Sequence, residues 1–89
     1  MTEILRTASA GTDTSGDALV TVAPGAGKLE LNIKSVFYAQ FFSAIETSAR
    51  ELLAELGVEN AQVEIDDHGA LDWTLRARIE TAVLRGKGE

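Results

Sequence analysis

The period of the hydrophobic pattern changes at Ser35, and this change constrains the fold more than any other feature of the sequence. Over residues 28–34, every second residue is leucine or isoleucine and the others are polar. This period of two predicts a half-buried strand. Beyond Ser35, the expected N-cap, apolar residues recur at helical spacing and predict a long amphipathic helix that ends at Gly57, with Glu46 and Arg50 paired on its outer face. The apolar residues of this helix are Phe37, Phe41, Ile45, Ala49, Leu52, Leu53 and Leu56.

Two more strands and a second helix complete the predicted order of elements. Residues 18–23 predict a strand, and the proline and glycines at 24–27 predict a turn that pairs it with 28–34 as an antiparallel hairpin. Residues 58–66 predict a third strand, and the turn at 67–69 leads into a last helix. One face of that helix carries Leu71, Leu75, Ile79 and Val83.

The resulting order, β-β-α-β-α, predicts an α+β fold. We expect a two-layer α/β sandwich in which two helices cover one face of a small three-stranded sheet. The strand–helix–strand passage between the second and third strands predicts a right-handed parallel crossover.

Outside these elements the chain is polar and rich in glycine. Residues 7–17 contain no large apolar side chain, which predicts a mobile loop. The chain has 89 residues, which fits one domain. We therefore expect a flexible N-terminal segment at 1–17, a single domain at 18–85 and a frayed tail at 86–89.

The composition narrows the classes of function. A net charge of −6 argues against binding to nucleic acid and to anionic membranes. No apolar run approaches the roughly 20 residues that span a bilayer. No secretory signal is visible at the N-terminus, and there is no cysteine, so the expected location is the cytoplasm and no thiol chemistry comes from the chain itself.

The glycine-rich segment at 24–28 is a weak match to a phosphate-binding loop. The P-loop pattern needs a glycine where this chain has Val22, and a serine or threonine where it has Leu29. A strand follows the segment instead of a helix. These departures favour a plain turn between strands.

The single histidine, His68, lies among three aspartates, Asp66, Asp67 and Asp72. Carboxylates favour helix N-termini, so we prefer a structural role for them over a metal site. Paired carboxylates for acid–base catalysis would need a water-excluding pocket to shift their pKa values. The aromatic residues favour core or interface positions, with Trp73 partly exposed and available to a partner; they are Phe37, Phe41, Phe42 and Trp73.

Ser15 is the remaining candidate. By residue type alone it is a loop residue. The only nearby bases are Asp13 and Asp17, which are poor bases for a hydroxyl in a wet loop. Ser15 therefore suits a passive acceptor that another enzyme modifies.

Two motifs together carry a family resemblance. The segment A-G-T-D-T-S-G-D at 10–17, with the following strand and Pro24, resembles the start of the acyl carrier (gamma) chain of bacterial citrate lyase. The segment D-D-H-G-A-L-D at 66–72, running into L-R-A-R at 75–78, resembles the second signature of that family. Leu56-Gly57-Val58 with Val63 occupies the family's helix-to-strand passage, and the resemblance covers residues 10–84.

The resemblance implies a covalent prosthetic group on Ser15. In that family the matching serine carries 2'-(5''-phosphoribosyl)-3'-dephospho-CoA through a phosphodiester, and the thiol of this arm holds an acetyl or citryl group. The implied partners are the alpha (transferase) chain, the beta (lyase) chain and the prosthetic-group transferase. The implied chain is a carrier and not an enzyme, with no catalytic residue and no metal of its own.

Several alternatives stay open. Ser9, Thr12 and Thr14 are rival hydroxyls for the attachment. A related citramalate lyase or malonate decarboxylase uses a similar carrier. An interaction module without a prosthetic group is a second class of function, and a small hydrolase or metal-dependent enzyme a third.

Overall fold

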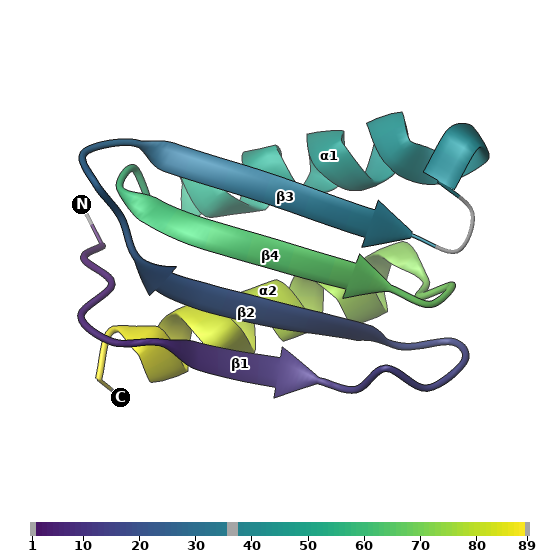
Figure 1. Ribbon diagram of the computed structural model, residues 1–89, viewed down its shortest axis with the longest axis horizontal. Coiled ribbons are helices and arrows are strands. Elements are labelled where there is room, and N and C mark those ends of the chain that lie inside the picture. The colour runs from purple at the N-terminus through teal and green to yellow at the C-terminus, as the bar shows by residue number, and fades with distance from the viewer. Residues whose placement is uncertain (1, 36–37, 89) are drawn as a thin grey trace.

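The structure, a computed structural model, describes residues 2–35 and 38–88, while the side chains of 38–41 lie outside this description. It contains four strands and two helices in the order β-β-β-α-β-α (Figure 1). The strands are β1 (Ala8–Gly11), β2 (Ala18–Pro24), β3 (Leu29–Ser35) and β4 (Ala61–Asp67). The helices are α1 (Tyr38–Glu55) and α2 (Asp72–Gly86).

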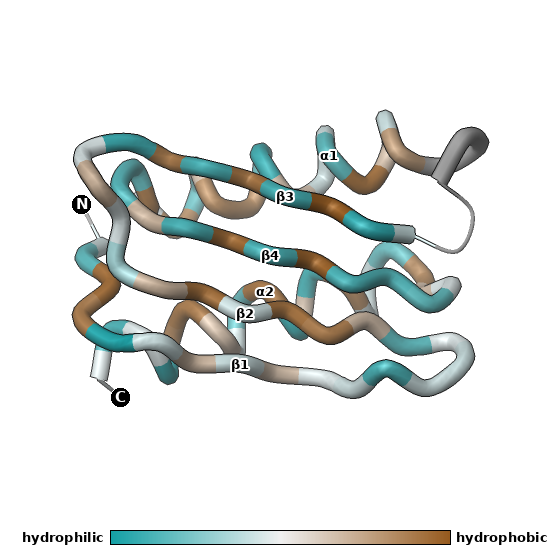
Figure 2. The backbone as a smooth tube through the Cα atoms, in the orientation of Figure 1, coloured by the Kyte–Doolittle hydropathy of each residue, from teal (hydrophilic) through white to brown (hydrophobic). Residues whose placement is uncertain are grey.

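The α+β class and the two-layer arrangement are confirmed. Both helices lie against the same face of the sheet, α1 along β3 and α2 along β1 and β2 (Figure 1). Apolar and polar residues alternate along β3 and β4, as Figure 2 shows. The apolar residues face the helices and form a single core, and burying a side chain of this size fully contributes about 1.5–3 kcal/mol. The largest fully buried side chains are Val20, Val22, Leu53, Val63, Ile65, Ile79 and Val83.

The predicted hairpin between the second and third strands is wrong. The sheet order is β1-β2-β4-β3, so β4 lies between β2 and β3. It pairs antiparallel with β2 and parallel with β3, with Ile65 opposite both Val20 and Ile33. The predicted parallel crossover through α1 is confirmed. A period-two pattern shows which face of a strand is buried but not which strand lies beside it, because the hydrogen bonds of a sheet run sideways from the backbone.

The segment at 25–28 therefore crosses the start of β4. Gly27 N donates to Asn60 Oδ1 at 2.8 Å, and Ala61 N donates to Lys28 O at 3.2 Å. A Cβ on Gly25 would lie 2.3 Å from Asn60 Oδ1 and 2.5 Å from Ala61 N. This close approach explains the glycine without any phosphate-binding role.

The predicted three-stranded sheet is also wrong, because β1 is a fourth strand at its edge. β1 pairs antiparallel with β2, from Ala8 opposite Val22 to Gly11 opposite Leu19. Its inward side chains are alanines, and the backbone of α2 comes close enough for Ala10 to be buried. Part of the N-terminal segment that the sequence predicts to be flexible is therefore a strand. The mobility of the rest of 1–17 stays a prediction.

The predicted C-terminal end of α1 is confirmed, and the predicted N-cap is wrong. Gly57, with φ +77°, ends the helix as predicted: its N–H donates to Ala54 O, and the N–H of Val58 donates to Leu53 O. This is the Schellman arrangement, which satisfies two of the last helical carbonyls. Ser35 is not the N-cap, because it is the last residue of β3.

The aromatic residues of the first helix are only partly described. Phe42 is half-buried against the core, as predicted for a core or interface position. Phe37 lies outside the described residues, as does the side chain of Phe41.

The predicted apolar stripe of α2 is shorter at one end, and the helix is longer at the other. Leu71 precedes the helix and is 56% exposed, while Leu75, Ile79 and Val83 are buried as predicted. Gly86, predicted to begin a frayed tail, is instead a buried residue of the helix, and its carbonyl accepts from two N-terminal amides, Leu5 N and Arg6 N. Among the described residues, neither helix has the length and apolar character needed to cross a bilayer.

Candidate functional site

Ser15 lies at the tip of the loop between β1 and β2. The Asp17 N–H donates to Thr14 O at 3.1 Å and closes a turn in which Ser15 is the second residue. Gly16, the third residue, has φ +86°, close to the value that a type II turn requires there. Ser15 is exposed, and its hydroxyl makes no hydrogen bond to any described residue.

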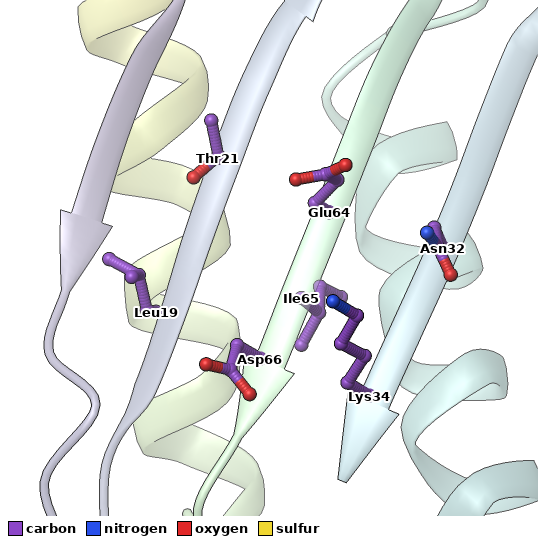
Figure 3. A pocket seen from close by; sticks show the side chains of 7 residues that line it. All are labelled: Leu19, Thr21, Asn32, Lys34, Glu64, Ile65 and Asp66. Atoms are coloured by element: carbon purple, nitrogen blue, oxygen red, sulfur yellow. The ribbon is translucent and has the colours of Figure 1, made fainter.

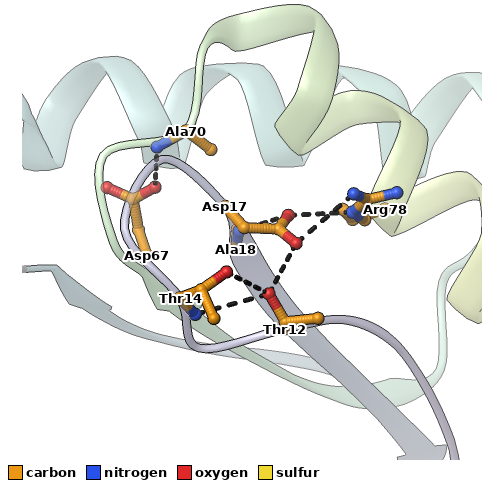
Figure 4. A network of polar contacts seen from close by, with 7 residues as sticks. All are labelled: Thr12, Thr14, Asp17, Ala18, Asp67, Ala70 and Arg78. Atoms are coloured by element: carbon orange, nitrogen blue, oxygen red, sulfur yellow. Dashed lines mark hydrogen bonds and ion pairs between the residues drawn. The ribbon is translucent and has the colours of Figure 1, made fainter.

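The side chain of Asp17 organises this loop (Figure 4). The Arg78 guanidinium binds it with two nitrogens, Nε to Oδ1 at 2.9 Å and Nη2 to Oδ2 at 3.3 Å. The Thr12 hydroxyl donates to Oδ2 at 2.7 Å, and Ala18 N donates to Oδ1 at 2.8 Å. The bond from Arg78, then those from Thr12 and Ala18, hold the pKa of the Asp17 carboxyl well below its usual range. Asp17 is therefore a fixed anion that anchors the loop and is unsuited to act as a base.

Gly11 provides the room for this ion pair. Its φ is +94°, and a Cβ there would lie 1.9 Å from Ala18 O and 3.0 Å from Arg78 Cδ. A larger residue would collide with the next strand and with the stem of the arginine. Gly11 of the first motif is therefore a structural requirement of the loop.

The second motif lies beside the first. Gly16 N donates to His68 O at 2.7 Å, and His68 N donates to Asp17 O at 2.9 Å, which extends the β2–β4 pairing by one residue pair beyond Ala18 and Asp67. The turn after β4 is held by Asp67, whose Oδ1 accepts from Ala70 N at 3.0 Å and whose Oδ2 accepts from the Ser35 hydroxyl at 2.9 Å. The two motifs are distant in sequence but form one surface around Ser15.

The aspartates near His68 have separate structural partners. His68 Nε2 lies 3.1 Å from Asp66 Oδ2, close enough for an ion pair when the ring is protonated but not aligned as a hydrogen bond. Asp72, in the first turn of α2, accepts a hydrogen bond from the Ser48 hydroxyl. Within residues 2–35 and 38–88, no three His, Cys, Asp or Glu side chains converge as metal ligands.

A shallow hollow of about 170 Å³ lies on the face of the sheet that the helices leave open (Figure 3). Pockets that enclose small molecules are usually about 300–1,000 Å³. Five of its seven lining residues are polar or charged. Its residues are Leu19, Thr21, Asn32, Lys34, Glu64, Ile65 and Asp66. This surface is too small and open to exclude water from a reaction.

Sequence reasoning predicted Ser15 as the acceptor but missed the residues that hold its loop in place. Thr12 and Thr14 were rival acceptors, but their hydroxyls bond each other at 2.7 Å and Thr12 also bonds Asp17. Ser15 is the hydroxyl of this loop that remains available. The role of Arg78 was not predicted, although the residue lies within the second motif, because nothing local connects it to Asp17.

The comparisons with known proteins identify the family of the chain. The malonate decarboxylase delta subunit family of acyl carrier proteins matches residues 5–86. The citrate lyase acyl carrier protein of Escherichia fergusonii is 49% identical over 84 residues, covering 93% of this chain and 87% of the relative. That of Pectobacterium carotovorum is 46% identical over 83 residues, covering 93% and 86%. The chain belongs to the acyl carrier protein family of citrate lyase.

The fold comparison leads to the same architecture. A chain in the crystal structure of a Pseudomonas malonate decarboxylase hetero-tetramer with malonate superimposes with a TM-score of 0.79 at 24% identity, covering 93% of this chain and 86% of that one. Membership of the family confirms the prediction of an acyl carrier without catalytic activity of its own. It also implies a prosthetic group.

Proposed function

We propose that this chain is the acyl carrier subunit of citrate lyase and that the Ser15 hydroxyl carries its prosthetic group. The observation that carries the proposal is the Ser15 turn: an exposed, unbonded hydroxyl on a loop that the Asp17–Arg78 ion pair anchors. The proposed group is 2'-(5''-phosphoribosyl)-3'-dephospho-CoA, joined by a phosphodiester. The exposed turn accommodates such an attachment without displacing any packed side chain.

The chain would bind and present the arm and do nothing further. The arm would supply a thiol for the acetyl and citryl groups, which this chain cannot do because it has no cysteine. Asp17 is unsuited to take the proton from Ser15, since its carboxylate is held ionised by Arg78 and Thr12. The base for attachment must then come from the modifying transferase.

Because this chain only presents the arm, its proposed partners are the proteins that perform the chemistry. They are the alpha chain, which transfers the acyl group, the beta chain, which cleaves the citryl thioester to oxaloacetate, and the prosthetic-group transferase. The proposed location is the cytoplasm. The relatives named citrate lyase acyl carrier protein are 44–49% identical, whereas the malonate decarboxylase chain is 24% identical, which favours citrate.

Intact mass spectrometry of the chain produced with its transferase and arm precursor tests the attachment. We expect one adduct on the wild-type chain, none on Ser15→Ala, and an unchanged adduct on Ser9→Ala and Thr14→Val. Because Ser15 is exposed and unbonded, Ser15→Ala keeps the wild-type fold, which circular dichroism checks. An adduct on Ser15→Ala would overturn the assignment.

Reconstitution with the alpha and beta chains tests the substrate. We expect the loaded carrier to support cleavage of citrate with these chains, and to give no malonate decarboxylation with the subunits of that enzyme. Malonate turnover instead would establish the second candidate, which the match to the malonate decarboxylase delta subunit family supports.

A further inference from the structure

Two large apolar side chains are exposed beside the Ser15 turn. Leu71 is 56% exposed and Trp73 is 70% exposed, and both lie where the chain enters α2. The turn that precedes them is bonded to the Ser15 loop through Gly16 N and His68 O at 2.7 Å. Figure 1 shows the β1–β2 loop and the β4–α2 turn at the same end of the molecule. Exposed tryptophan is a common anchor of protein interfaces, whereas a monomer without a partner gains nothing from exposing it.

Acidic side chains lie at the same end of the molecule as these two residues. Asp13 lies in the Ser15 loop, Asp66 is 44% exposed near the end of β4, and Asp72 is exposed in the first turn of α2. The nearby Arg78 is already neutralised by Asp17. Asp66 lies opposite Lys34 in the β3–β4 register, on the open face of the sheet, so its charge is offset there. Asp13 and Asp72 remain as the negative rim beside the apolar anchors.

We propose that this end, the docking surface formed by Leu71, Trp73, Asp13 and Asp72, binds the subunit whose active site receives the arm. The inference rests on the proposed function, because a carrier must contact the subunit into which its arm reaches. The matching surface on the partner is an apolar pocket bordered by lysine or arginine side chains. Complementary charge would speed the encounter, and the two apolar side chains would supply most of the affinity.

The shape of the molecule favours this end over the other. The domain is 31 Å long and 21 × 19 Å across. Leu5, which is 64% exposed, is bonded through its N–H to Gly86 O at the last residue of α2, at the opposite end from Ser15 (Figure 1). Docking through Leu5 would place the length of the domain between the arm and the active site it must enter. Docking through Leu71 and Trp73 places the arm at the interface.

The negative charge of the docking surface also decides which kind of partner can bind there. A second copy of this chain would bring a like-charged rim against the first, and the whole chain carries −6. An anionic membrane is repelled for the same reason. A subunit with a basic rim is the occupant that gains from both the charge and the apolar area.

Matched substitutions at the two ends test the proposal. Holo-protein, with its Ser15 adduct confirmed by mass, is titrated against the purified alpha and beta chains by calorimetry at low and high salt. We expect Leu71→Ala and Trp73→Ala each to weaken binding to one of these subunits at least about tenfold, and Trp73→Phe to recover most of the affinity. Leu5→Ala, an equally exposed leucine at the far end, should change the affinity less than about twofold.

The charges are tested by measuring the rate of association with the same subunits at low and high salt. Asp13→Lys should slow association and reduce its salt dependence, while Glu59→Lys, also exposed but before the start of β4 at the far end, should not. Wild-type affinity of the loaded Leu71→Ala and Trp73→Ala proteins would overturn the docking surface and leave the proposed function intact. Loss of self-association instead of subunit binding in these variants would assign the surface to a second copy. Failure of the wild-type chain to accept an adduct would overturn the proposed function itself.

Discussion

Replacing Gly11 with alanine should destabilise the loop that presents Ser15 while leaving the core unchanged. Gly11 ends β1 with φ +94°, and an added Cβ would lie 1.9 Å from Ala18 O. An ordinary contact needs at least 3.4 Å, so the two backbones must separate by about 1.5 Å, the difference between 3.4 and 1.9 Å. The movement would disrupt the end of the β1–β2 pairing.

The expected loss in the free energy of unfolding for Gly11→Ala has two parts. The positive φ alone costs about 1–2 kcal/mol for an alanine. Separating the strands at Gly11 and Leu19 would weaken one or two backbone hydrogen bonds, each contributing about 0.5–1.5 kcal/mol. We expect Gly11→Ala to lower the free energy of unfolding by about 2–4 kcal/mol.

Gly27→Ala is the matched control. Gly27 has φ +107°, but nothing lies within 4 Å of an added Cβ, so alanine there incurs only the backbone strain. Urea unfolding followed by circular dichroism measures both variants. Gly11→Ala should be less stable than Gly27→Ala by about 1–2 kcal/mol, the contribution of the collision. Equal losses in the two variants would refute the reasoning that the approach of Ala18 and Arg78 requires glycine at position 11.

Two further predictions concern the ion pair and the core. Because Arg78 and Thr12 hold the pKa of Asp17 below that of an unfolded aspartate, about 3.9, the stabilisation is fully present above about pH 4 and is lost as the pH falls further. Asp17→Asn removes this titration, so urea midpoints should fall less between about pH 4 and pH 2 than in the wild type; parallel profiles would contradict the role of the pair. Ile79→Ala should lower the free energy of unfolding by about 2–5 kcal/mol because it leaves a cavity under the sheet, and the partly exposed Leu84→Ala by less than about 1 kcal/mol; similar losses would place Ile79 outside the core.

The sequence pointed to Ser15 as the candidate acceptor, but it did not predict the contacts that hold the Ser15 loop. Ser15 could be chosen because its motif resembles that of a family, and its exposure follows from the small polar residues around it. The ion pair that holds the loop joins Asp17 to Arg78, which are 61 residues apart. No local pattern links two residues at that separation. Their contact exists because α2 packs across β1 and β2.

The sequence by itself determined the local elements. Residues 18–23 predicted the strand β2, period-two runs predicted β3 and β4, and helical spacing predicted α1 and α2, because burial of one face leaves a repeat in the chain. It could not reveal β1, whose inward residues are alanines, since small side chains produce little hydrophobic contrast. The order of the strands was also undetermined, because backbone hydrogen bonds carry no side-chain signature.

Only the tertiary structure decided what surrounds Ser15. It placed β4 between β2 and β3, so that the turn after β4 lies against the Ser15 loop and two distant motifs become one surface. It also placed Leu71 outside the helix stripe, where the sequence alone predicted a buried residue. The physical reason is the same in each case: sequence periodicity reports which side of an element is buried, while packing between elements decides which of them are neighbours.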